Sequence, residues 1–179
     1  IVASSTATTS TYNVTMAGWV RWQGTTGSPQ IIINNGNTGS QGFTLYLDNS
    51  ASDRLLILCG GVTFTTPTTP YYLPTNVWTH LALVRSGSWS LFVNGASIPL
   101  GASCTPNALN ASSKFSVGST DSGAQFFKGE VDDMRVYRRN LSTAEIRALA
   151  GYHPMQVTNA LTSLKLHLEP NAATYAVGT

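Results

Sequence analysis

The stretch NVWTHLALVRSGSWSLFVNGASI, residues 76–98, decides the fold. It contains two runs rich in apolar and aromatic residues, which Ser-Gly-Ser separates at positions 86–88. The second run ends at Asn94-Gly95, a dipeptide that favours the two-residue turn of a β-hairpin. Short apolar runs bounded by turn residues are typical of strands. The stretch therefore predicts neighbouring antiparallel strands.

The same pattern extends in both directions from this hairpin. In GFTLYLD, Phe43, Leu45 and Leu47 alternate with Thr44 and Tyr46, which predicts a strand with one buried face. The stretch RLLILCG is continuously apolar, as expected for a strand that is covered on both faces. The runs that predict strands outside the hairpin are residues 13–22, 30–36, 42–48, 54–60, 114–119 and 130–137.

One short segment, LSTAEIRALAG, has the signature of a helix. Ser142 and Glu145 have the spacing of a capping box, and Leu141 with Ile146 can form the accompanying hydrophobic contact. Gly151 lies where a C-terminal cap belongs. The chain is therefore predicted to be all-β, a two-sheet antiparallel jelly-roll sandwich with one short surface helix near residues 142–150.

Composition and charge exclude some classes of protein. Charged residues make up 10% of the chain, well below about 25% in typical soluble proteins. The net charge is only +2 and the basic residues are scattered, so nucleic acid is not an expected partner. No apolar run is long enough to span a membrane. This composition is common in extracellular β-rich modules, so we expect a secreted or cell-surface protein.

The chain has two cysteines, Cys59 and Cys104. Cys59 ends an apolar strand, and Cys104 follows the hairpin in a loop flanked by Gly and Pro. In an exported protein such a pair predicts a disulfide, and two buried free thiols are the alternative.

Two long motifs resemble a known family. The first is the stretch quoted above, with its W-x-H strand and its L-(aromatic)-V-Asn-Gly hairpin. The second is FSVGSTDSGAQFFKGEVDDMRVYRRNLSTAEIRAL, residues 115–149. Together they resemble the concanavalin A-like, laminin-G-like (LamG) jelly-roll modules over roughly residues 12–150. The resemblance implies a sandwich that serves as a glycan binder, an adhesion module or a spacer.

Asp132 and Asp133 are adjacent carboxylates in a predicted strand. The resemblance implies a structural role for Asp132, or a part in holding a calcium ion, which needs about 6–8 oxygen ligands. Adjacent strand residues point to opposite faces, so the two acids are not expected to act on one sugar unless a bulge intervenes. Glu130 and Asp132 share a face, but Lys128 and Arg135 lie close enough to neutralise them. The sequence thus predicts no enzymatic activity and no cofactor other than a calcium ion at Asp132.

Several aromatic and polar residues are candidates for binding a glycan. An exposed ring can stack on the apolar face of a sugar, while nearby amides and carboxylates bind its hydroxyls. The alternative is that the rings only cover the edges of the sheets. The two polar loops NNGNTGSQ, with its predicted turn at Asn35-Gly36, and GSTDSGAQ supply candidates as well. The predicted ligand-binding residues are Trp22, Asn34, Asn35, Tyr71, Tyr72, Trp89, Asp121 and Gln125.

The two ends of the chain differ in pattern. Residues 1–11 are rich in Thr and Ser and predict a linker or flexible tail, as in a piece of a larger protein. Residues 12–179 are predicted to form one domain. Within it, residues 161–170 place Leu164, Leu166 and Leu168 on one face and predict a strand that completes the sandwich.

Two functions follow from this reading. The first is a non-catalytic extracellular module, part of a larger protein or fibre, which recognises a glycan or glycoprotein on a cell surface. The second is a structural spacer or assembly domain without its own ligand, associating with copies of itself through a sheet edge.

Overall fold

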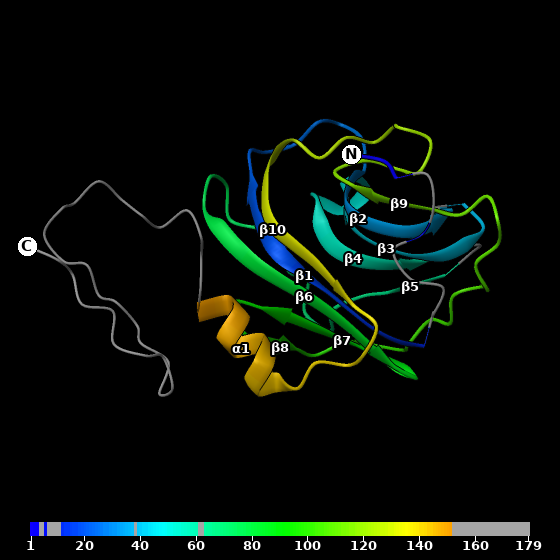
Figure 1. The fold of residues 1–179 in the computed structure, drawn as a ribbon. Coiled ribbons are helices and arrows are strands. Elements are labelled where there is room, and N and C mark those ends of the chain that lie inside the picture. The colour runs from blue at the N-terminus through cyan, green and yellow to red at the C-terminus, as the bar shows by residue number, and fades with distance from the viewer. Residues whose placement is uncertain (4–5, 7–11, 38, 61–62, 152–179) are drawn as a thin grey trace, which may run out of the picture.

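The computed structural model describes residues 1–3, 6, 12–37, 39–60 and 63–151 (Figure 1). Within these residues, ten strands, one 3-10 turn and one helix alternate with loops. In chain order they are β1 Asn13–Trp22, β2 Gln30–Asn37, β3 Gln41–Asp48, the 3-10 turn Asn49–Ala51, β4 Arg54–Cys59, β5 Thr63–Thr65, β6 Trp78–Ser86, β7 Ser88–Val93, β8 Ala96–Ile98, β9 Lys114–Val117, β10 Gly129–Tyr137 and α1 Thr143–Gly151.

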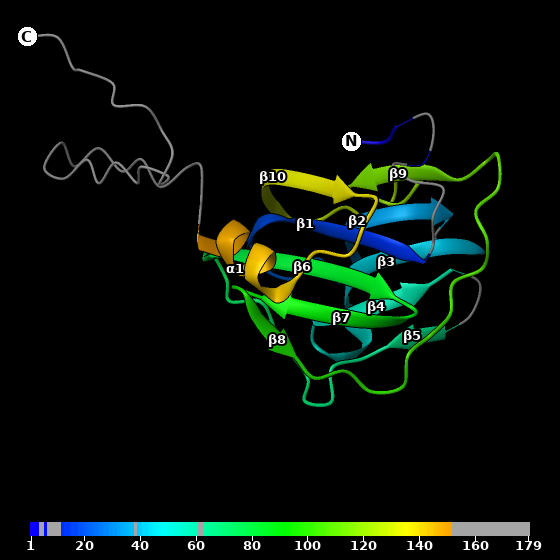
Figure 2. The same cartoon turned by 60° about the horizontal axis from the view of Figure 1, so that its bottom comes forward.

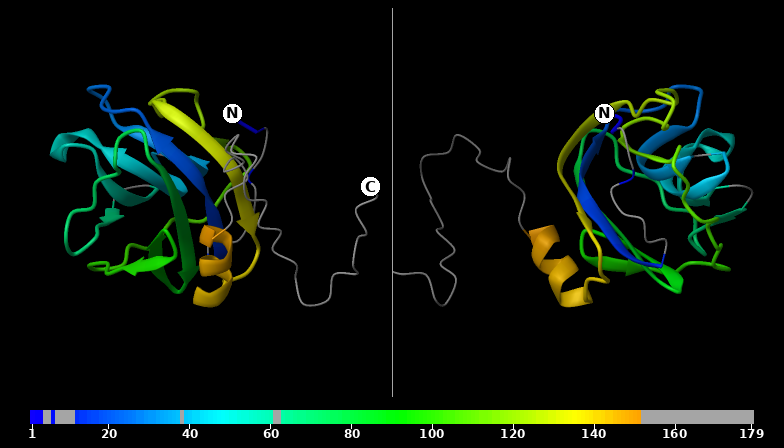
Figure 3. Two further views of the ribbon diagram at one scale, coloured as in Figure 1. Left: turned by 90° about the vertical axis from the view of Figure 1, so that its left-hand side faces the viewer. Right: turned by 45° about the vertical axis from the view of Figure 1, so that its right-hand side comes forward.

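The described strands form two antiparallel sheets of five strands each. Sheet A has the order β5-β4-β3-β2-β9, and sheet B has the order β10-β1-β6-β7-β8. Figure 3 shows the two sheets as separate layers, with α1 on the outside of sheet B. This confirms the prediction of an all-β, two-sheet antiparallel sandwich with one short helix.

The hydrophobic core lies between the sheets. Phe43, Leu45 and Leu47 all point into it, which confirms the alternation in GFTLYLD. The Phe43 ring lies 5.0 Å from the ring of Trp89, so side chains of the two sheets meet directly. Burying each such side chain stabilises the fold by about 1.5–3 kcal/mol. This contact is therefore one of those that hold sheet A against sheet B.

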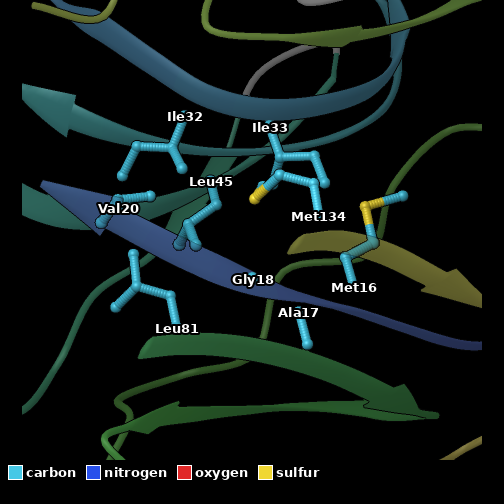
Figure 4. A pocket seen from close by; sticks show the side chains of 9 residues that line it. All are labelled: Met16, Ala17, Gly18, Val20, Ile32, Ile33, Leu45, Leu81 and Met134. Atoms are coloured by element: carbon cyan, nitrogen blue, oxygen red, sulfur yellow. The ribbon is translucent and has the colours of Figure 1, made fainter. Parts of the chain in front are cut away.

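A small cavity of about 10 Å³ remains inside this core (Figure 4). Its lining is apolar, including Ile33, Leu45 and Leu81, and Met134 borders it from β10. A space of this size is at the lower limit for one water molecule, which would also need polar partners. The cavity is therefore a packing defect and not a ligand site.

Helix α1 covers part of the outer face of sheet B (Figure 2). The Ser142 backbone N–H donates to Glu145 Oε2 at 2.8 Å, and the Glu145 backbone N–H donates to Ser142 Oγ at 3.3 Å. Both halves of the predicted capping box are thus formed. Ile146 is fully buried against Leu141 and Phe92, which confirms a short surface helix that lies on the sheet.

The central hairpin and the disulfide are also as predicted. Asn94 and Gly95 both have positive φ, at 48° and 76°, which is the conformation that a tight hairpin turn between β7 and β8 needs. Cys59 and Cys104 are bonded, with their Cα atoms 6.0 Å apart. The bond joins β4 of sheet A to the loop that follows β8.

The ends of the chain are described only in part. Ile1 to Ala3 extend sheet A beyond β9, because the Val117 N–H donates to the Ile1 carbonyl at 2.9 Å and the Ala3 N–H donates to the Phe115 carbonyl at 2.8 Å. Most of the predicted linker, residues 1–11, and the whole predicted strand 161–170 lie outside the described residues. Both stay predictions.

Candidate functional site

The outer face of sheet A presents a row of side chains that is set by the strand register. In β4, Leu55 and Ile57 point into the core, so Arg54 and Leu58 point outward. In β3 the core residues are Phe43, Leu45 and Leu47, so the outward residues are Thr44, Tyr46 and Asp48. Tyr46 pairs with Leu56, and Asp48 pairs with Arg54, so the outward residues of the two strands are neighbours.

Two aromatic rings stand at the edge of this face. Phe64 of β5 pairs with Leu58, and Tyr72 pairs with Arg54 through an isolated bridge. The two rings are 52% and 49% exposed. Both lie on the same side of β4, four residues apart along it, which corresponds to about 13 Å. Both residues pair with β4, although the chain between Phe64 and Tyr72 leaves the sheet.

Tyr46 and an ion pair lie beside these rings. Arg54 Nη2 is 3.2 Å from Asp48 Oδ2, and both side chains are partly buried. Burial, and then the charge of Asp48, raise the pKa of Tyr46 to about 12. The phenol therefore stays neutral at physiological pH and can donate one hydrogen bond and accept others.

We call Tyr46, Leu58, Phe64 and Tyr72, together with the Arg54–Asp48 pair, the outer aromatic surface. It combines apolar rings with a phenol, a guanidinium and a carboxylate. A sugar ring offers an apolar face and a rim of hydroxyls, so this combination matches it. Because the ion pair is fixed beside the rings, little ordering of these side chains is needed on binding.

The structure brings five of the predicted ligand-binding residues to one end of the sandwich, near the loops 23–29, 66–77 and 118–128. Tyr72 is exposed, whereas Tyr71 is partly buried against the core. Trp22 is only 8% exposed and belongs to the core cluster. Asp121 and Gln125 lie half-buried in the loop 118–128, where the Ile31 N–H donates to the Gln125 carbonyl at 3.0 Å.

Asn34, Asn35 and Trp89 lie elsewhere, and all three are buried. Asn34 Oδ1 accepts a 2.7 Å hydrogen bond from Thr44, and the Trp89 indole N–H donates to the Cys104 carbonyl at 2.9 Å. The predicted turn at Asn35-Gly36 is wrong, because both residues belong to β2. Both asparagines are therefore buried within β2, and no loop presents them to a ligand.

Sequence reasoning found only Tyr72 and missed the other five members of the outer aromatic surface, which are Tyr46, Asp48, Arg54, Leu58 and Phe64. A usable signal existed for Tyr46, because it occupies the outward phase of GFTLYLD. Phe64 lies in the three-residue strand Thr63–Thr65, which is too short to show alternation. Its position beside Leu58 follows only from the long-range pairing of β5 with β4.

The adjacent acids Asp132 and Asp133 lie at a β-bulge. The pairing of β10 with β1 shifts there, and Asp133 has a positive φ of 48°. Asp132 Oδ1 accepts the Asp133 backbone N–H at 2.8 Å, while Asp133 pairs with Arg135 at 2.7 Å. The structure therefore shows a local hydrogen-bonding role for Asp132.

These acids do not form a metal site with their neighbours. Across the part of the chain that the structure describes, no three His, Cys, Asp or Glu side chains converge as ligands. The bonds of Asp132 to the backbone and of Asp133 to Arg135 occupy oxygens that a calcium ion would need. The prediction of a calcium ion at Asp132 stays a prediction, which a calcium titration would test.

Two stacked antiparallel sheets with a short helix on one outer face define a concanavalin A-like β-sandwich. The family model Laminin_G_3, described as the concanavalin A-like lectin/glucanases superfamily, matches residues 1–147. The chain therefore belongs to this laminin-G-like family of the superfamily. Among curated protein sequences, none matches the chain.

Similar solved structures share the sandwich at low sequence identity. A candidate carbohydrate-binding protein from Bacteroides ovatus has a TM-score of 0.62 at 18% identity, over 82% of this chain and 42% of that one. Domain 4 of AbnA, a GH43 extracellular arabinanase from Geobacillus stearothermophilus solved with arabinotriose, has 0.57 at 20%, over 77% and 66%. Trypanosoma rangeli sialidase has 0.55 at 18%, over 78% of this chain but only 22% of the sialidase. At these identities the likeness shows the fold.

The comparisons contradict the expectation that the chain is not an enzyme. The sialidase contains a region with this fold, and so does the arabinanase described above, as its domain 4. The physical argument for excluding hydrolysis also fails, because it assumed regular alternation. The bulge at Asp133 breaks the alternation, so Asp132 and Asp133 need not lie on opposite faces.

No helix among the described residues is both long enough and apolar enough to cross a membrane.

Proposed function

We propose that this domain binds carbohydrate through the outer aromatic surface. The observation that carries the proposal is the pair of exposed rings, Phe64 and Tyr72, fixed along one side of β4 beside the Arg54–Asp48 ion pair. Family membership and the carbohydrate-binding neighbour support it. The rings supply stacking surfaces, and Arg54 with the neutral Tyr46 phenol supplies hydrogen bonds to sugar hydroxyls.

The proposed setting is outside the cell, as part of a larger protein. The disulfide between Cys59 and Cys104 supports this setting, because such bonds persist in oxidising compartments. The proposed partner is a glycan or glycoprotein on a cell surface. A single shallow site of this kind gives about millimolar to micromolar affinity, so adhesion would use several copies of the domain at once.

A titration with a panel of neutral and acidic oligosaccharides, followed by calorimetry, tests the proposal. We expect saturable binding to at least one of them. Replacing Phe64 or Tyr72 with Ala should weaken that binding about tenfold, equivalent to about 1.4 kcal/mol. The same mixtures, analysed for cleaved products, report whether the bound glycan is also turned over.

Phe126 provides the matched control, because it is 65% exposed but lies in the loop 118–128, outside the outer aromatic surface. Phe126→Ala should bind like the unaltered domain. If Phe126→Ala abolishes binding while Tyr72→Ala does not, the site lies at the loops and the proposed surface is wrong. Absence of binding to every sugar would refute carbohydrate recognition itself.

A further inference from the structure

A concave surface lies at the β8 edge of sheet B, beside the edge strand β5 of sheet A. This groove has a volume of about 330 Å³. Ser88, Ser90, Ser97 and Ser103 contribute hydroxyls to its wall, and Ile98 and Leu100 contribute apolar surface. We call it the serine groove. Its volume lies at the lower end of the range of about 300–1,000 Å³ that is typical of small-ligand sites.

The groove exists because β8 is shorter than its neighbour. Ile98, the last residue of β8, pairs with Leu91, so the first half of β7 has no strand beside it on this edge. The Trp89 backbone N–H turns instead to Ser103 Oγ at 3.3 Å. The Gly101 N–H donates to the Thr66 carbonyl at 2.9 Å, which ties the far wall to the edge of sheet A. Both sheets therefore hold the groove open.

The floor of the serine groove is rigid. The Cys104 carbonyl accepts the Trp89 indole N–H at 2.9 Å and Arg85 Nη1 at 3.1 Å. The Arg85 guanidinium lies 4.9 Å from the centre of the Trp89 ring, and Cys104 is bonded to Cys59 of β4. A ligand would meet a preformed surface, which lowers the ordering cost of binding.

The chemistry of the lining selects a neutral ligand. Within the part of the chain that the structure describes, no Asp, Glu, Lys or Arg side chain lines the groove. Among the described residues, none forms a hydrogen bond with the Ser88, Ser90 or Ser97 hydroxyl, so these groups can donate to and accept from a ligand. Several unpaired hydroxyls beside Ile98 and Leu100 match a polyhydroxylated molecule that has apolar faces.

We propose that the serine groove binds a short neutral saccharide, at a site separate from the outer aromatic surface. The two surfaces lie on different sides of β5, because Phe64 points outward from sheet A whereas the next residue, Thr65, is buried and lines the groove. The inference does not depend on binding at the outer aromatic surface.

Backbone amide NMR on the whole chain tests the inference, with glucose, galactose, maltotriose, xylotriose and arabinotriose as probes at up to about 10 mM, near the weak limit for a single shallow site. We expect saturable shifts at residues 88–90 and 97–103 with at least one probe. N-acetylneuraminic acid, which carries a carboxylate, should cause none there. Ser90→Tyr fills the groove with a ring and should remove these shifts.

Ala108→Tyr is the matched control, because Ala108 is exposed in the loop that follows the groove and does not line it. It should leave the shifts at residues 88–90 unchanged. Shifts confined to Tyr46, Phe64 and Tyr72 would support the outer aromatic surface and overturn the serine groove. Absence of shifts at residues 88–90 and 97–103 with all five neutral probes, or groove shifts with N-acetylneuraminic acid alone, would also overturn it.

Discussion

The Met134 side chain occupies the space that any side chain at Gly18 would need. A Cβ built on Gly18 would lie within 3.0 Å of Met134 Cα and closer still to its sulfur atom. Figure 4 shows the two residues on adjacent strands at the border of the core cavity. Met134 thus reaches the core only because position 18 has no side chain.

Gly18→Ala should therefore destabilise the fold by overpacking. We expect a loss of about 1–3 kcal/mol in the free energy of unfolding, measured by chemical denaturation. Gly101→Ala is the control, because a Cβ there would meet its nearest atom at 3.6 Å, which is ordinary contact. Equal stability of Gly18→Ala and Gly101→Ala would contradict the packing argument.

Removing the disulfide should lower stability and loosen the floor of the serine groove. Cys59 and Cys104 close a loop with a separation of 45 residues, for which the chain-entropy model gives about 4 kcal/mol as an upper value. The double variant Cys59→Ser with Cys104→Ser should melt at a lower temperature. Its tryptophan fluorescence should also shift, since the Cys104 carbonyl accepts the Trp89 indole N–H. An unchanged melting temperature would argue against this role.

Stability should fall as the pH drops below about 6.5, through His80. Burial lowers the pKa of His80 from 6.5 to about 4, with Asp133 opposing the shift and Arg135 adding to it. The folded protein therefore disfavours protonation of His80. The contribution of neutral His80 to stability is present in full above pH 6.5. It is lost progressively between pH 6.5 and about 4, where the unfolded chain binds the proton and the folded chain does not.

Denaturation at a series of pH values measures this effect. The loss should be on the order of 2 kcal/mol, because the side chain is only 2% exposed but lies near the surface charges of β10. His80→Gln should have a flatter profile between pH 6.5 and 5, above the range where ordinary carboxylates titrate. Identical profiles for the two proteins would show that another group is responsible.

Truncating Ile146 should detach α1 from sheet B. The side chain is fully buried against Ala82, Phe92 and Leu141, so Ile146→Ala should cost about 2–5 kcal/mol. Thr143→Ala, at an exposed position of the same helix, should cost less than about 0.5 kcal/mol. Thermal unfolding of the two variants decides this, and similar losses for both would mean that packing against the sheet does not hold the helix.

The predicted strand 161–170 can be tested by shortening the chain. Among the described strands, β10 pairs only with β1, so its other edge can accept a strand. If Leu164, Leu166 and Leu168 complete the sandwich there, ending the chain after Gly151 should lower the melting temperature. A shortened protein that is soluble and equally stable would show that the tail is dispensable.

Local patterns in the sequence predicted most of the fold but little of the site. Two features depend only on neighbouring residues: the alternation of Phe43, Leu45 and Leu47, and the Asn94-Gly95 turn. Both can therefore be predicted from short stretches of sequence. Asn35-Gly36 has the same letters as a turn but lies in β2, where the neighbouring Asn34 amide bonds to Ser116 of β9 and to Thr44 of β3. Tertiary hydrogen bonds override the local preference there.

The outer aromatic surface depends on pairings between distant segments. Phe64 and Tyr72 meet along β4 only because two separate stretches of chain pair with it, and no window of sequence contains that register. The bulge at Asp133 was equally hidden, since a positive φ leaves no mark in a run of residues that otherwise favours a strand. Such features need the three-dimensional pairing before they can be recognised.

The extra residue in β10 also governs which insertions and deletions the strand can accept. Before the bulge Asp132 pairs with Trp19, and after it Arg135 pairs with Ala17. Removing Asp133 would restore an unbroken ladder while both halves keep their present partners. Removing Arg135, in the half after the bulge, would instead turn over the residues that follow it and would bring Val136 out of the core. During evolution, β10 can therefore lose a residue at the bulge and keep its pairing with β1, whereas most deletions elsewhere in the strand would disturb that pairing.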